Sequence, residues 1–190
     1  MIPSIFTVDI RVFLWLRSGI QDSRWEDLFY YASDLLAWSP LFIFIAILLA
    51  YSRPRNIGWN LFFGLGSCIL SMQSAQILST FFQEAAPYVV EFIRVDAVLP
   101  AYSPVLAYSL PDPAVAGLAG LILFAMMRLS PNHQRNTRFL AIIPFVFAIF
   151  RIGSGYCYPS HALLGIILGA LIGFLLSRVV RNFEVVFINN

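Results

Sequence analysis

The sequence predicts an all-α fold: a polytopic membrane bundle of about five transmembrane helices with an amphipathic interfacial helix at its N-terminal end. Hydrophobic residues fill 59% of the 190 positions, charged residues fill only 12%, and the mean hydropathy is +0.79. A soluble domain carries about 25% charged residues, so this chain has too little charge to cover its apolar surface in water. We therefore expect a single membrane domain over residues 1–190.

Five stretches of the chain are apolar enough to span a bilayer, for which a helix needs about 20 mostly apolar residues. The predicted spans cover about residues 35–51, 57–82, 113–129, 139–152 and 161–180. The last span carries Gly165, Gly169 and Gly173 at a spacing of four, which predicts close contact with another helix.

The second predicted span is less apolar than the others because it contains several small and polar residues. Such residues usually face neighbouring helices rather than lipid. We expect helix contacts at Gly64, Gly66, Ser67, Ser71, Gln73, Ser74 and Gln76.

Residues 5–31 mix apolar side chains with charged ones such as Asp9 and Arg17. Three arginines and four acidic residues interrupt this stretch by residue 27, so a sixth full span is disfavoured. The pattern predicts an amphipathic helix that lies in the outer interface of the membrane, followed by aromatic residues of the interfacial belt that lead into the first span.

Arginine placement predicts the orientation of the bundle. The clusters follow the first, third and fifth spans: Arg53 and Arg55; Arg128, Arg135 and Arg138; and Arg178 and Arg181. Five alternating spans place all three clusters on one side, which the positive-inside rule makes cytoplasmic. The other side then holds the more acidic loop with Glu84, Glu91 and Asp96. We expect an integral protein of a bacterial inner membrane.

Charge and cysteine content exclude further classes of protein. The net charge is only +2, which gives no basic surface for nucleic acid. All twelve basic residues are arginine, and the sequence contains no lysine. Cys68 and Cys157 lie far apart and form no disulfide framework. We expect membrane lipids, and other membrane protein subunits, as partners, and we expect no cofactor.

The turn before the last span carries the most specific motif. It reads Phe-Arg-Ile-Gly-Ser-Gly-Tyr-Cys-Tyr-Pro-Ser-His-Ala-Leu-Leu-Gly over residues 150–165. This run resembles the third signature of the type 2 phosphatidic acid phosphatase superfamily of membrane lipid phosphatases, which is Ser-Arg, five residues, His, three residues, Asp. Arg151 matches the arginine, and Gly155, the 158–160 run and Gly165 match the framework. Cys157 stands where the family has its nucleophilic His, His161 stands where it has Asp, and Phe150 replaces the Ser.

The other two signatures of the family are weaker in this chain. Where the family has Pro-Ser-Gly-His, the sequence has Pro111, Asp112, Pro113 and Ala114, so the first proline alone matches. The remaining signature is Lys, six residues, Arg-Pro; alignment on Pro87 places Ser79 at the lysine and Ala86 at the arginine. The length, the span order and the N-terminal helix are similar to the small undecaprenyl-diphosphate phosphatases.

In this family, as the resemblance implies, a His attacks phosphorus, an Asp orients it, a second His protonates the leaving oxygen, and a Lys and two Arg hold the phosphoryl oxygens. Of that set only Arg151 remains here. Each lost charge-assisted contact costs about 2–4 kcal/mol of transition-state stabilisation. The resemblance therefore implies a lipid-phosphatase fold with a degenerate site, and we expect Asp112 to pair with Arg151 inside the former phosphate cavity.

Two other interpretations of the motif residues stay open. Cys157 is a potential thiolate nucleophile, with His161 four residues on as its base. Cys157 and His161 are also potential metal ligands, but two ligands are too few for structural zinc and His133 belongs to the opposite loop. We expect no metal site.

Three hypotheses for function follow from the sequence. The first is a non-catalytic structural or regulatory subunit of a membrane complex, or a lipid or isoprenoid binder, because a fold can outlive its function. The second is an active lipid phosphatase or phosphotransferase with a rearranged site, acting on an undecaprenyl diphosphate or phosphatidate type of substrate. The third, a transporter or channel, is disfavoured because the spans contain few charges and show no inverted repeat.

Overall fold

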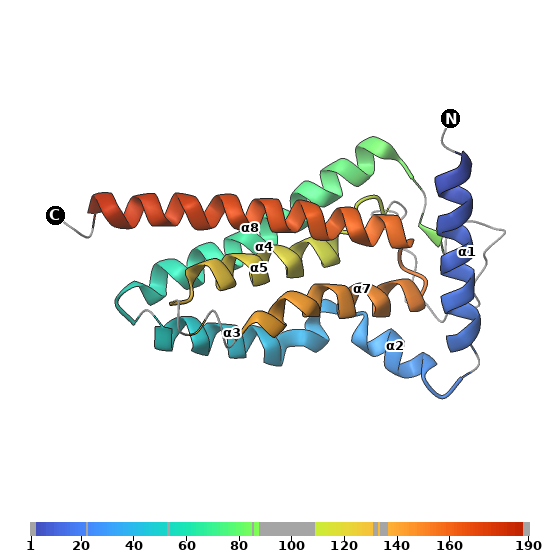
Figure 1. Cartoon of the computed structure of the whole chain (residues 1–190), viewed down its shortest axis with the longest axis horizontal. Helices are drawn as coiled ribbons and strands as arrows, with labels where there is room; N and C mark the ends of the chain where they lie inside the picture. Colours follow the sequence, from blue (N-terminus) through green and yellow to red (C-terminus); the bar gives the residue numbers. More distant parts are fainter. Residues whose placement is uncertain are drawn as a thin grey trace.

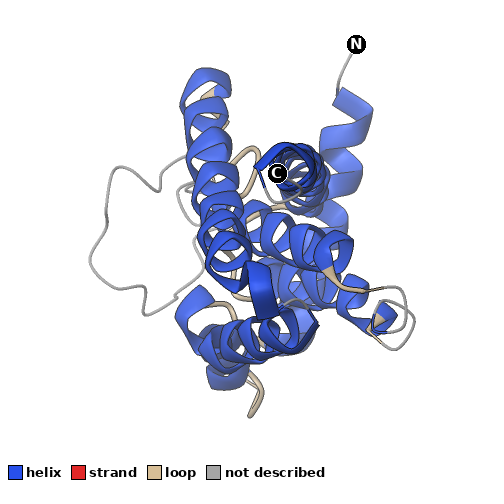
Figure 2. Cartoon of the chain, turned by 90° about the vertical axis from the view of Figure 1, so that its left-hand side faces the viewer, coloured by secondary structure: helices blue, strands red, loops and turns tan. Residues whose placement is uncertain are grey.

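In a computed structural model, the regular secondary structure of the described part of the chain is entirely helical (Figure 1 and Figure 2). The described part comprises residues 3–21, 23–52, 54–84, 86–87, 109–130, 133 and 137–187, with the backbone alone at 3–7 and 184–187. The elements are α1 (Pro3–Ile20), α2 (Glu26–Ala32), η1 (Leu35–Trp38), α3 (Ser39–Ser52), η2 (Pro54–Asn56), α4 (Ile57–Phe82), α5 (Pro113–Arg128), η6 (Arg138–Ile142), α7 (Ile143–Gly153) and α8 (Pro159–Phe187).

The expected all-α membrane bundle is confirmed. Within the described residues, three segments are long and apolar enough to cross a bilayer, Leu35–Ser52, Pro54–Phe82 and Pro159–Phe183, and Pro113–Arg128 is a shorter apolar helix. The predicted interfacial segment 5–31 contains two helices, α1 and α2, which are separated by a turn.

The shorter apolar helix, α5, forms the centre of the bundle. Eleven of its sixteen residues are buried, and it packs against both α4 and α8. A helix that is surrounded by other helices does not itself have to face lipid over a full span.

The glycine stripe of α8 lies directly against the backbone of α5, as its spacing predicted. A methyl group at Gly169 would meet the Ala116 carbonyl, and one at Gly173 would meet the Gly120 carbonyl. A methyl group at Gly120 of α5 would meet Ser67 and Ser71 of α4 and also the Gly169 carbonyl of α8. Three helices therefore approach one another along lines of small residues.

Successive long helices run in opposite directions (Figure 1). The end of α3, the start of α4, the end of α5 and the start of η6 lie at one end of the bundle, and α8 runs towards that same end. Arg55, Arg128 and Arg138 belong to these segments, and Arg178 and Arg181 belong to the last turns of α8. Arg53, Arg135, Glu91 and Asp96 lie outside the described residues.

Helix α1 crosses the opposite end of the bundle, where α5 and α8 begin and α7 ends (Figure 1). Phe13 is completely buried and packs edge-on against Tyr158 at 5.4 Å between ring centroids. Arg17 donates to the Gly153 carbonyl at 2.9 Å and pairs with Glu26 at 2.8 Å. These contacts hold α1 and the short helix α2 on the end of the bundle.

The small and polar residues of α4 divide between two faces, which corrects part of the expectation for this span. Gly64, Ser67 and Ser71 are buried against α5 and α8. Gly66 has nothing within 4 Å of an added methyl group, and Gln73 is exposed. The physical reason is the helical period: residues 66 and 73 lie about opposite the buried positions 64, 67, 71 and 75 at 100° per residue.

The glycine contacts predict a strong difference between two otherwise similar substitutions. Gly169→Ala should destabilise the protein by about 1–3 kcal/mol, because the added methyl group meets backbone atoms that cannot move aside. Gly58→Ala, with nothing within 4 Å of the new methyl group, should be neutral or slightly stabilising because alanine favours helices. Thermal unfolding in one detergent measures both; equal melting temperatures would contradict the close approach of α5 and α8.

Candidate functional site

Asp112 places its carboxylate at the amino terminus of α5. Pro113 follows at the first helical position, where its fixed φ and missing N–H suit a helix start. The Val115 amide donates to Asp112 Oδ1 at 2.9 Å, and the Asp112 side chain is completely buried. A helix amino terminus attracts anions, and here the anion belongs to the chain itself.

Arg151, in the last turn of α7, pairs with the same carboxylate. Its Nη2 lies 2.7 Å and its Nε 3.3 Å from Asp112 Oδ2. The guanidinium carbon lies 4.3 Å from the centroid of the Tyr156 ring. The expected Asp112–Arg151 pair is therefore confirmed, and both carboxylate oxygens of Asp112 have donors.

The turn after α7 is shaped by a glycine that has a left-handed backbone. Gly155 has a φ of 85°, its amide donates to the Ile152 carbonyl, and the Tyr156 amide donates to the Arg151 carbonyl, each at 3.0 Å. This pattern is a Schellman motif, which favours glycine at the left-handed position. It returns Tyr156 to the guanidinium of Arg151, so this framework glycine positions the site.

Cys157 lies in the same turn, and its side chain is completely buried. Burial raises the pKa of the thiol well above its ordinary value; the charge of Asp112 and a hydrogen bond to it raise this pKa further, whereas Arg151 opposes the shift. The thiolate is the nucleophilic form of cysteine. At neutral pH, Cys157 is therefore in the unreactive thiol form.

His161 lies in the first turn of α8, beside Asp112 through its backbone. Its carbonyl accepts from the Asp112 amide at 3.1 Å, while its Nδ1 lies 2.6 Å from Ser109 Oγ. Its ring packs edge-on against Tyr158, with 5.1 Å between centroids. Among the described residues, no hydrogen bond joins His161 to Cys157, so the nucleophile–base pair suggested by their spacing is not formed.

Asp9 of α1 also belongs to this region, although the sequence predicted it only as one of the charged residues of an amphipathic helix. Its Oδ1 accepts from the Ser160 amide at 2.9 Å and its Oδ2 accepts from the Ser160 hydroxyl at 2.6 Å. The spacing of Asp9, Phe13 and Arg17 could have indicated a shared buried face, because residues that lie four apart fall on one side of a helix. The structure buries all three.

The remaining predicted site residues differ in burial and in the contacts that they make. Pro111 is buried and Ala114 half-buried at the start of α5. Ser79 and Ala86 are buried, but the Ser79 hydroxyl donates to the Gln76 carbonyl of its own helix at 2.8 Å. The segment after α4 does reach the site: the Glu84 carbonyl accepts from the Ser109 amide at 3.2 Å.

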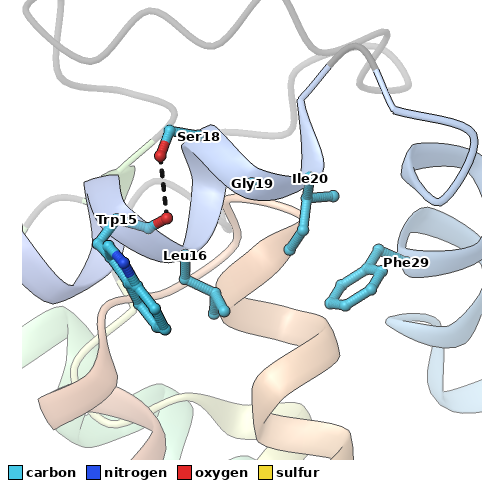
Figure 3. A pocket seen from close by; sticks show the side chains of 6 residues that line it. All are labelled: Trp15, Leu16, Ser18, Gly19, Ile20 and Phe29. Atoms are coloured by element: carbon cyan, nitrogen blue, oxygen red, sulfur yellow. Dashed lines mark hydrogen bonds between the residues drawn. The ribbon is translucent and has the colours of Figure 1, made fainter.

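A separate hollow of about 370 Å³ opens beside α1, and neither Asp112 nor Arg151 lines it. Figure 3 shows its lining, which is Trp15, Leu16, Ser18, Gly19, Ile20 and Phe29. The Ser18 hydroxyl donates to the Trp15 carbonyl at 3.0 Å, so the lining presents mainly apolar side chains. None of the predicted site residues contributes to this hollow.

A double-mutant cycle tests the energetic role of the ion pair. Removing one partner should cost about 3–5 kcal/mol, because it leaves an uncompensated buried charge. The single variants are Asp112→Asn, which keeps a helix cap, and Arg151→Met. The double variant should be more stable than either, which thermal unfolding in detergent can measure. If single and double variants have equal stability, the pair does not hold the site together.

The reactivity of Cys157 tests its burial. In a Cys68→Ala background, maleimide should label Cys157 of the folded protein at least about ten times more slowly at pH 7–8 than after denaturation. The raised pKa also predicts how the stability of the protein depends on pH. Because the folded thiol holds its proton more tightly than the unfolded one, stability should be lost as the pH rises above the ordinary thiol pKa. Rapid labelling at pH 7 would contradict this geometry.

The fold is similar to that of a known membrane phosphatase. No family model matches the sequence, and no curated protein matches it. The crystal structure of a transmembrane PAP2-type phosphatidylglycerolphosphate phosphatase from Bacillus subtilis superposes with a TM-score of 0.68 at 16% sequence identity, covering 95% of this chain and 88% of that one. The chain is therefore an integral membrane protein with the fold of a membrane lipid phosphatase.

Proposed function

We propose that this protein is a catalytically inactive descendant of the type 2 phosphatidic acid phosphatase superfamily. It acts as a structural or regulatory subunit of a membrane complex, or as a lipid or isoprenoid binder. The observation that carries the proposal is the buried Asp112–Arg151 pair. A carboxylate of the chain holds both the amino terminus of α5 and the arginine that matches the third signature of the family.

The charge of the region supports an inactive site. Phosphoryl transfer depends on positive charge aimed at the phosphoryl oxygens in the transition state. Arg151 is neutralised by Asp112 at 2.7 Å, and the sequence has no lysine to replace it. A phosphate entering here would have to displace a buried carboxylate from two sets of donors.

The shape of the outer end supports a lipid ligand. The apolar hollow beside α1 lies on the helix predicted to rest in the membrane interface, and Trp15 at its rim is 75% exposed. Tryptophan is enriched at that level of a bilayer. We place α1 and the degenerate site on the outer face of an inner membrane, with the arginine-bearing end in the cytoplasm.

The alternative function is an active lipid phosphatase or phosphotransferase. The fold of the Bacillus subtilis phosphatase and the position of Cys157 next to Arg151 in the signature turn favour it. Against it, the buried thiol and the internal ion pair leave neither a ready nucleophile nor a free cation in the described part of the site.

A phosphatase assay separates the two functions. The purified protein should release no phosphate from undecaprenyl diphosphate, phosphatidate or phosphatidylglycerolphosphate, because several charge-assisted contacts are missing together. The Bacillus subtilis phosphatase in the same detergent is the positive control. Turnover that disappears in Cys157→Ala or Arg151→Ala would establish the enzyme instead.

Purification under mild detergent gives the complementary observation. Native mass spectrometry should find a retained lipid or a different protein subunit bound to the chain. A preparation that carries neither and is also inactive would refute the binding role.

A further inference from the structure

One face of helix α4 carries a stripe of exposed and half-buried residues that contains polar side chains as well as apolar or small ones. Phe62, Ile69, Gln73 and Thr80 are exposed, and Gly66 and Gln76 are half-buried. Gln73 lies about opposite the buried face of α4, at 100° per residue. At a rise of 1.5 Å per residue it is about 5 Å from the middle of the 26-residue helix, within the hydrocarbon core, which is about 30 Å thick.

An amide side chain in lipid requires a hydrogen-bonding partner. Within the described part of the chain, neither Gln73 nor Gln76 has a recorded side-chain hydrogen bond, whereas the Thr80 hydroxyl donates to the Ile77 carbonyl of its own helix at 2.8 Å. Gln73 is also too deep to reach the headgroups. The hydrogen-bonding partner of the Gln73 amide must therefore come from a group that packs against this face of the bundle from outside.

The spacing of the stripe fits a second helix. Its residues follow one another at alternating steps of four and three: 62, 66, 69, 73, 76 and 80. This is the period of the seam in a left-handed helix pair. Gly66 has nothing within 4 Å of an added methyl group, so another backbone can approach it closely.

We propose that α4 forms a parallel homodimer seam in which Gln73 of one copy hydrogen-bonds to Gln73 of a second copy. Copies inserted with the same orientation pair about a two-fold axis along the membrane normal, so each seam residue meets its own counterpart. The amide of glutamine carries both donors and an acceptor, so it complements itself. The seam contains no charged residue that would repel its counterpart.

Sedimentation of the full chain in detergent micelles tests the seam. The wild type should be a dimer, and Gln73→Leu should raise the dissociation constant at least about tenfold because the shared hydrogen bonds are lost. Gly66→Leu should have the same effect by blocking close approach. Gln73→Asn should keep most of the dimer, and Leu70→Ala, exposed but off the seam, should change nothing.

Cysteine crosslinking in vesicles of phosphatidylethanolamine and phosphatidylglycerol identifies the molecule that contacts the α4 seam. In a background that lacks Cys68 and Cys157, Ile69→Cys should crosslink to a second copy, and Leu70→Cys should not. Unchanged thermal unfolding of Gln73→Leu would show that the monomer fold is intact. A monomeric wild type, an unaffected Gln73→Leu dimer, equal crosslinking at both positions or a crosslink to a different protein would overturn the proposal.

Discussion

A buried ion pair lies at the end of the bundle where α5 and α8 begin. A carboxylate with no exposed surface is tolerated only because an arginine and a helix amino terminus both face it. The pair joins the start of α5 to the end of α7, and the Asp112 amide joins the same point to the start of α8. Three helices thus meet at one aspartate.

Close packing elsewhere supports this arrangement. The glycines of α8 and the small residues of α4 bring both helices against α5, which fixes where the amino terminus of α5 lies. The left-handed Gly155 then ends α7 and returns the chain to Arg151. Backbone geometry and electrostatics therefore both position Arg151 beside Asp112, and the apolar hollow beside α1 is a separate feature.

Much of this could be read from the sequence, because hydropathy and glycine spacing depend on the chain alone. The five predicted apolar segments each contain a helix, and the pairing of Asp112 with Arg151 followed from placing two degenerate signatures side by side. The sequence could not predict how the small and polar residues of α4 divide between its two faces, nor which residue Asp9 contacts, because both depend on which helices become neighbours. His161 shows the same limit: its spacing from Cys157 suggested a pair, but a proline and a turn direct its ring to Ser109.

The contact between Asp9 and Ser160 has a consequence for the electrostatics of this end of the bundle. The amino termini of α5 and α8 converge there, and each would normally present positive potential to the surroundings. Asp112 occupies the first and Asp9 the second. Carboxylates of the chain itself therefore offset the positive potential of both helix termini, so this end of the bundle offers little attraction to a further negative charge.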